Sequence, residues 1–198
     1  MWFWLQLAAV FSWSLINVLD SMLVRRFTKD PFVLMWAQSC FSVPILWLLL
    51  LLVFDIPAGW VVIFLIVGLL GYVGDLLFLV ILDRVDVSVS NVAWMILSVF
   101  LSLVGFWFFG ETWSVSQTIG VTLVFTGVFM LSLWHRRLGG FTSFLLLALL
   151  AVLYMPFYSV QKAALLAGQG ALAVSFWPIL SRETSAFLFP LLYPSLRR

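Results

Sequence analysis

The stretch that decides the fold is residues 60–82, which read WVVIFLIVGLLGYVGDLLFLVIL. A helix needs about 20 mainly apolar residues to cross the hydrocarbon core of a bilayer. Asp75 carries the one charge in this run. Backbone polar groups inside hydrocarbon must pair within the protein, so only helices and closed barrels span membranes. Because the run lacks the strict alternation of a barrel strand, we predict a membrane-spanning helix here.

The pattern recurs along the rest of the chain. Comparable apolar runs predict helices at 2–23, 32–54, 87–109, 115–134 and 143–166. The run 171–193 is weaker, because Arg182-Glu183 interrupts it between Pro178 and Pro190. We expect this run to span with its polar pair inside the bundle, and a broken or interfacial helix is the alternative. The predicted fold is therefore an all-α, polytopic transmembrane bundle of about seven helices.

Composition excludes several classes of protein. The chain is 65% hydrophobic and 9% charged, whereas soluble domains carry about 25% charged residues. Its net charge of +2 is too small to indicate nucleic-acid binding. Cys40 is the single cysteine and His135 the single histidine, so neither an internal disulfide nor a Cys/His metal cluster can form. Neither a GxxxxGK[ST] phosphate loop nor a catalytic Ser/His/Asp set is present. We predict no enzyme, no cofactor and no metal.

Basic residues are distributed unevenly between the predicted connections. They fall in the first, third and fifth connections and the C-terminal tail: Arg25, Arg26, Lys29, Arg84, Arg136, Arg137, Arg197 and Arg198. The second and fourth connections have none, and Lys162 is the exception to the pattern. By the positive-inside rule the N-terminus lies outside and the first, third and fifth connections are cytoplasmic. We expect a multi-pass protein of the cell membrane, in a prokaryote the plasma membrane.

Two segments show weak internal similarity. Residues 13–21 and 154–162 each begin with an aromatic residue and carry a polar pair seven residues later. The second copy lies five predicted helices further along the chain, an odd number, so it would have the opposite orientation in the membrane. Inverted repeats are common in secondary transporters.

Short motifs from the first to the fifth predicted helix resemble a known family. They are Asn17-Val18-Leu19-Asp20, the run DRVDVSVSN at 83–91, Phe108-Phe109-Gly110-Glu111, Gln117-Thr118-Ile119-Gly120 and Thr126-Gly127. As a set they resemble the five-helix repeat of the EamA family in the drug/metabolite transporter superfamily. The resemblance implies a first EamA-like repeat over 1–134 and a partial second repeat of about two helices over 143–198. It also implies a small-metabolite transporter that works by alternating access.

The chain departs from the pattern of its relatives in two respects. Ser98 stands about where the family often has a proline, and relatives usually have ten helices and a cytoplasmic N-terminus. Three explanations of the difference in length stay open: a truncated product, a fragment, or a chain that needs a homodimer or partner chain to supply helices. The alternative function is a non-transporting partner subunit or scaffold. For the orientation we rely on the distribution of basic residues, which places the N-terminus outside.

Polar residues inside the predicted helices are the candidates for binding a solute or a coupling proton. They are Asp75, Asp20, Asn17, Tyr72, Asn91, Tyr158 and Gln161. Counted from the helix ends, Asp20, Asp75 and Asn91 lie toward the same face of the bilayer. An intramembrane acid tends to face the bundle interior or water. The structural alternatives are an interior hydrogen bond of Asp75 or its pairing with Arg84, and a contact of Asp20 with Arg25 and water.

Two further features have a functional and a structural interpretation. Glu111 is a candidate gate, and the alternative is that it caps the fifth helix together with Ser114. Gly68, Gly71 and Gly74 on the third helix, and Gly120 and Gly127 on the fifth, predict close helix packing. The same small residues on the third helix would permit a homodimer.

Overall fold

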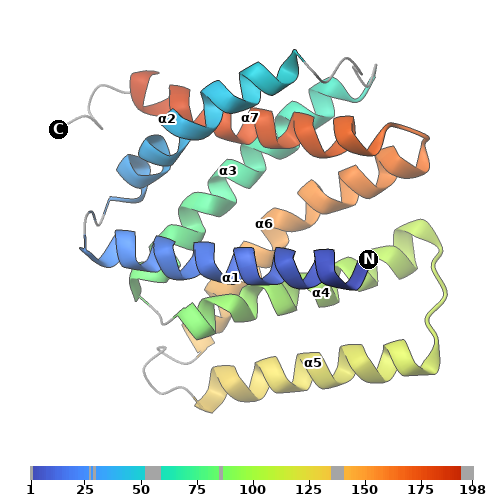
Figure 1. Cartoon of the computed structure of the whole chain (residues 1–198). Coiled ribbons are helices and arrows are strands. Elements are labelled where there is room, and N and C mark those ends of the chain that lie inside the picture. Colours follow the sequence, from blue (N-terminus) through green and yellow to red (C-terminus); the bar gives the residue numbers. More distant parts are fainter. Residues whose placement is uncertain are drawn as a thin grey trace.

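The computed structural model describes residues 2–26, 28, 30–51, 59–84, 87–134 and 141–192, with some side chains in these ranges left undescribed. In these ranges the chain forms seven helices and no strand (Figure 1). The helices are α1 (Trp2–Arg26), α2 (Pro31–Leu50), α3 (Val61–Arg84), α4 (Val87–Phe109), α5 (Val115–Trp134), α6 (Phe141–Leu166) and α7 (Ala171–Leu192). The all-α bundle predicted from the sequence is confirmed.

Helix ends follow local chemistry. Asp30 caps α2 by accepting a hydrogen bond from the Phe32 N–H at 2.9 Å, and Pro31 occupies the first turn, where its missing N–H costs nothing. Gly110, with φ of 66°, follows the last residue of α4 in a conformation that favours glycine. The helix α2 ends four residues before the predicted position 54; residues 52–58 lie outside the described residues. The prediction of a broken seventh helix is wrong, since α7 is continuous.

Three of the described helices are long and apolar enough to cross a membrane: Pro31–Leu50, Val61–Asp83 and Leu145–Leu166. Trp94–Phe109 and Val115–Gly127 are shorter apolar helices. The C-terminal ends of α1, α3 and α5 lie on one side of the bundle, and those of α4 and α6 on the other (Figure 1). Successive helices therefore alternate in direction, as a polytopic protein requires. The helices α1 and α6 run oppositely, while the division into two repeats stays a prediction.

The helix α3 is the centre of the bundle, with α6 and α7 packed against its glycine-rich face. A Cβ atom at Gly68 would lie 2.5 Å from Ser181 Cβ and 2.7 Å from the Pro178 carbonyl oxygen. Small residues let helices approach this closely, so the packing role predicted for these glycines is confirmed. Because α6 and α7 of the same chain already cover this face, it offers no surface for the homodimer that the glycines were expected to permit.

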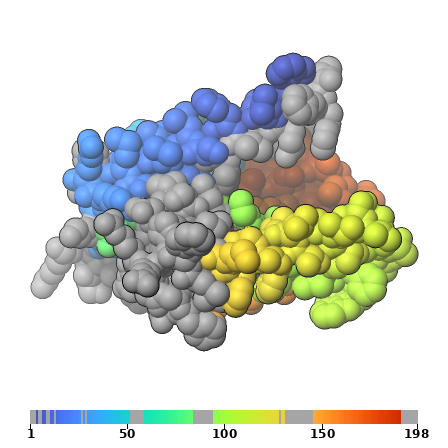
Figure 2. Space-filling view, turned by 90° about the horizontal axis from the view of Figure 1, so that it is seen from below, coloured from blue at the N-terminus to red at the C-terminus, as the bar shows by residue number. Residues whose placement is uncertain are grey.

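The helix α5 lies at the edge of the bundle, with its side chains largely exposed (Figure 2). Thr118, Thr122 and Thr126 each donate a side-chain hydrogen bond to the carbonyl one turn earlier, which satisfies their hydroxyl groups. No described atom lies within 4 Å of a Cβ built at Gly120 or Gly127. The packing role predicted for these two glycines is therefore wrong within the described part of the chain, because no helix lies against them.

Candidate functional site

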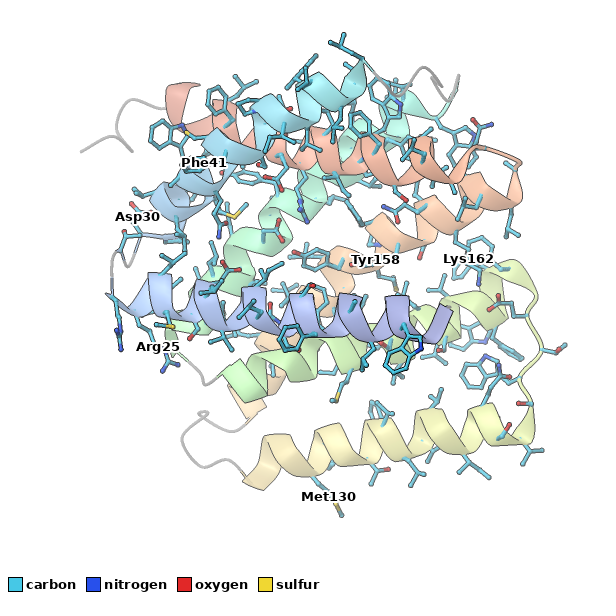
Figure 3. The ribbon with its side chains drawn as sticks, viewed as in Figure 1. Arg25, Asp30, Phe41, Met130, Tyr158 and Lys162 are labelled. Atoms are coloured by element: carbon cyan, nitrogen blue, oxygen red, sulfur yellow. The ribbon has the colours of Figure 1, made fainter. Side chains whose placement is uncertain are left out.

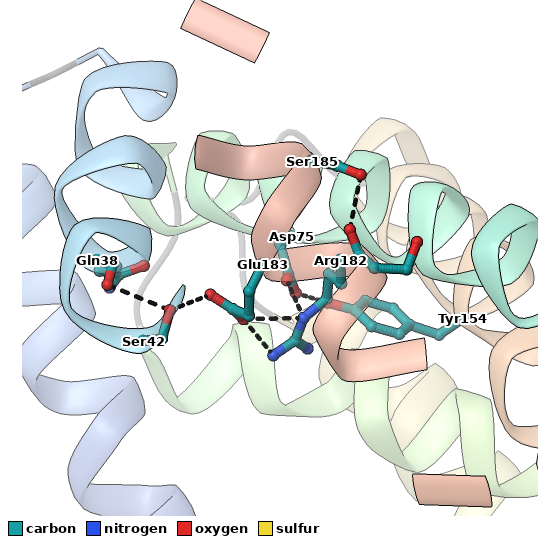
Figure 4. Close-up of polar contacts among 8 residues, drawn as sticks. Gln38, Ser42, Asp75, Tyr154, Arg182, Glu183 and Ser185 are labelled. Carbon is teal, nitrogen blue, oxygen red and sulfur yellow. Dashed lines mark hydrogen bonds and ion pairs between the residues drawn. The ribbon is translucent and has the colours of Figure 1, made fainter. Parts of the chain in front are cut away.

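An ion pair in the middle of the bundle joins three helices. The Arg182 guanidinium on α7 places Nε 3.2 Å from Asp75 Oδ2 on α3. Tyr154 on α6 donates its hydroxyl hydrogen bond to Asp75 Oδ1 (Figure 4). The Asp75 side chain is 19% exposed and that of Arg182 is 23% exposed, so both charges are largely removed from solvent. Asp75 is thus held from two sides by residues of α6 and α7.

The glycines of α3 make this arrangement sterically feasible. A Cβ at Gly74 would lie 2.9 Å from the Tyr154 ring, and a Cβ at Gly71 would lie 3.4 Å from Arg182 Cδ. Glycine at both positions lets the ring and the arginine side chain lie directly against the α3 backbone. Each partner therefore reaches Asp75 across a surface without side chains.

The polar contacts continue from the ion pair to α2 and α1. Arg182 Nη2 donates to Glu183 Oε1 at 2.8 Å, and Ser42 on α2 donates to Glu183 Oε2 at 2.6 Å. One turn earlier on α2, Gln38 Nε2 donates to Asp20 Oδ1 on α1 at 2.7 Å. With Asp20, five helices thus contribute to one group of polar side chains, and Figure 4 shows the members on α2, α3, α6 and α7. Removing one member of a buried ion pair costs about 3–5 kcal/mol, because the other charge is left unpaired, so Asp75 on α3 and Arg182 on α7 each depend on the presence of the other.

A cavity of about 290 Å³ opens beside this group. Its lining residues are Ile16, Asn17, Asp20, Met35, Gln38, Ser42, Asp75, Phe78, Leu79, Trp94, Arg182 and Glu183. They come from α1, α2, α3, α4 and α7, and most lie in the half of the bundle nearer the connections after α1 and α3. Ligand cavities are commonly about 300–1,000 Å³ and combine an apolar wall with a few polar groups. The cavity matches this description at the small end of the range.

The structure brings three of the sequence-predicted site residues together. Asn17, Asp20 and Asp75 all line the cavity. Tyr158 on α6 is not a lining residue. Its ring centroid lies 6.5 Å from that of Tyr154, which contacts Asp75. The Arg84 side chain, the alternative partner of Asp75, lies outside the described residues, and the structure joins Asp75 to Arg182 and to the Tyr154 hydroxyl. For Asp20 the alternative was a contact with Arg25 and water. The structure shows that Asp20 accepts a hydrogen bond from Gln38.

Two of the remaining predicted residues do not line the cavity, and the side chain of the third is not described. Tyr72 is buried against the Phe189 ring, with centroids 5.9 Å apart, and is not a lining residue of the cavity. Gln161 is half-buried on α6 and is likewise not a lining residue. The Asn91 side chain lies outside the described residues.

Sequence reasoning did not select Gln38, Ser42, Tyr154, Arg182 or Glu183 as site residues. A signal for two of them was present, because Arg182-Glu183 interrupts an apolar run and an intramembrane charge needs a partner. Asp75 is the one acid in the middle of the third predicted helix. It was therefore the natural partner for an arginine inside the seventh predicted helix. Gln38, Ser42 and Tyr154 gave no comparable signal, since their roles depend on which helices are neighbours.

A second polar contact lies at the opposite end of the bundle, where Figure 3 shows Lys162 far from Arg25 and Asp30. Lys162 Nζ on α6 lies 2.5 Å from Glu111 Oε1 in the connection after α4. Lys162 also lies over the Phe109 ring, 4.9 Å from its centroid. The capping role expected of Glu111 is wrong: Ser114 Oγ accepts the Gln117 N–H at 3.3 Å, and Glu111 pairs with Lys162 instead.

These helices match a known family. A model of the EamA-like transporter family matches residues 1–133, which run from the N-terminus almost to the end of α5. The chain belongs to the EamA-like transporter family. It is therefore a membrane transporter of the drug/metabolite transporter superfamily. In this EamA-like transporter, Tyr154, Arg182 and Glu183 come from α6 and α7, beyond the matched residues. Neither the curated proteins nor the solved structures include a match to the chain.

Proposed function

We propose that the chain is a secondary transporter that moves a small solute by alternating access, with the solute binding in the cavity beside Asp75. One observation carries the proposal: an Asp75–Arg182 ion pair, little exposed and inside an apolar bundle, lines a cavity shared by five helices. Charges in a membrane interior are costly and typically mark solute or proton pathways.

The ion pair offers a physical basis for coupling binding to movement. Arg182 contacts both Asp75 and Glu183, so a cationic solute or a proton that engages Asp75 competes with the Arg182 guanidinium for the Asp75 carboxylate and leaves Arg182 to Glu183. Weakening the Asp75–Arg182 contact weakens the attachment of α7 to α3. We propose that α1–α5 form the first repeat and α6–α7 part of a second, and that their relative movement opens the cavity to alternate sides. Asp75 and Asp20 are the candidate carriers of a coupling proton.

Glu111 and Lys162 are the candidate gate at the other end. Their contact connects the α4–α5 connection to the end of α6 across the two proposed repeats. The two side chains are 50% and 37% exposed, so water screens the pair and its contribution to stability is small. A contact that forms and breaks at low cost is suited to opening and closing.

The test is solute flux into vesicles that contain the purified chain, with and without an imposed proton gradient. Asp75→Asn and Arg182→Gln are each expected to lower flux at least tenfold while the protein still inserts. Asp83→Asn is the matched control, because it removes the same charge from an exposed residue at the end of α3. Flux of the two site variants equal to that of Asp83→Asn would remove the ion pair from the mechanism.

The same assay distinguishes the transporter from a partner subunit or scaffold. A chain that inserts normally but moves no solute in a broad screen would support the scaffold, and co-expression with a candidate partner chain would then restore flux. Crosslinking in membranes tests for a homodimer. Reporter fusions to the two ends test the expected location in the cell membrane with the N-terminus outside.

A further inference from the structure

We infer that the solute is a small organic cation, a protonated or quaternary amine, bound by the carboxylates and the aromatic rings that line the cavity together. This inference rests on the proposed function of the cavity. Asp20, Asp75 and Glu183 line the cavity together with one cation, Arg182. With all four ionised the lining has a formal charge of −2, and it stays negative if one carboxylate holds a proton.

The hydrogen bonds locate the acid that is best placed to receive the cation. Arg182 contacts Asp75 and Glu183, and both of these acids also accept a hydroxyl hydrogen bond. Asp20 accepts instead from the neutral amide of Gln38, which supplies no compensating charge. Asp20 is also the lining acid on α1, across the cavity from α7. A monovalent cation between Asp20 and the Asp75–Arg182 pair would compensate the charge of the Asp20 carboxylate.

Aromatic rings line the cavity close to Asp75. Phe78 and Trp94 line the cavity with their ring centroids 5.7 Å apart, and Trp94 lies 5.0 Å from the Tyr154 ring centroid. Aromatic faces attract ammonium groups, and aromatic cages recognise quaternary amines. Ile16, Met35 and Leu79 supply the apolar remainder of the lining. An anion would face a net negative wall, and a neutral solute would leave the acids without a counter-charge.

Three probes of matched shape separate these classes: choline, its uncharged isostere 3,3-dimethylbutan-1-ol, and the anion 3,3-dimethylbutanoate. Binding to the purified full chain is measured in micelles by isothermal calorimetry. A hydrogen bond or contact to a charged group corresponds to a factor of roughly 10 to 100 in affinity. We expect choline to bind at least about tenfold more tightly than either other probe.

Variants assign that preference to the cavity. Asp20→Asn should weaken choline binding about tenfold or more, Asp20→Glu should retain most of it, and Asp83→Asn should leave it unchanged. Equal or tighter binding of the alcohol or the anion by the unmodified chain would overturn the inference, whether or not the variants fold. So would a choline preference that survives Asp20→Asn. Flux of neutral or anionic solutes in the vesicle screen, without flux of cations, would uphold the proposed transport and reject only this solute class.

Discussion

Replacing Gly68 with alanine tests the packing on which the ion pair depends. The added Cβ would lie 2.5 Å from Ser181 Cβ, 2.6 Å from its Oγ and 2.7 Å from the Pro178 carbonyl oxygen. The carbonyl belongs to the α7 backbone, so it cannot turn aside as a flexible side chain would. The helices α3 and α7 must therefore separate, and this strains the hydrogen bond of 2.9 Å that Ser181 donates to the Leu65 carbonyl.

The expected magnitude combines opposing effects. Overpacking of a close contact costs about 1–3 kcal/mol, and loss of the Ser181 hydrogen bond costs about 1 kcal/mol. Alanine in place of glycine within a helix returns about 1 kcal/mol. The net loss for Gly68→Ala is about 1–3 kcal/mol. Gly120→Ala on α5 is the matched control, because no described atom lies within 4 Å of its added Cβ. The Gly120→Ala variant should therefore show only the gain of about 1 kcal/mol from replacing glycine by alanine within a helix.

The assay is thermal unfolding of both purified variants in the same detergent at one scan rate, since membrane proteins commonly unfold irreversibly. The variants should differ by about 2–4 kcal/mol in stability, which corresponds to roughly 4–16 °C in apparent Tm for a chain of this size. Gly68→Ala should also lower solute flux, because Arg182 lies one turn beyond Pro178 on α7. Equal melting of the two variants would show that α3 and α7 do not pack as described.

Three other substitutions test separate contacts. Tyr154→Phe removes the hydroxyl donor to Asp75 and should destabilise the chain by about 1.5–3 kcal/mol in thermal unfolding, whereas an unchanged Tm would contradict the contact. Glu111→Lys should alter solute flux while changing stability by less than about 1 kcal/mol. Exchange of both charges, Glu111→Lys with Lys162→Glu, should restore flux, and failure to restore it would argue against a gate. Asp30→Ala removes the cap of α2 and should cost about 0.5–2 kcal/mol, measured as increased proteolysis near the start of that helix.

Much of the site could be anticipated because intramembrane polar residues are few. Asp20, Asp75 and Asn17 were selected as exceptions in apolar runs, and the structure places all three on one cavity. Tyr72 was selected because it lies three residues before Asp75 on the same helix. It packs against Phe189 of α7 instead, because a position one turn away along α3 meets a different part of the neighbouring helix.

The approximate position of each helix and the alternation of helix directions could be predicted from the sequence, because a bilayer accepts long apolar helices and charged residues collect between them. The choice of neighbours was decided by the tertiary structure. Asp75 could have met Arg84 from its own helix, but the glycine face of α3 admits α6 and α7 and so brings Tyr154 and Arg182 to it. Helix formation is local in the chain, whereas helix pairing depends on shape complementarity between segments about 80 to 110 residues apart.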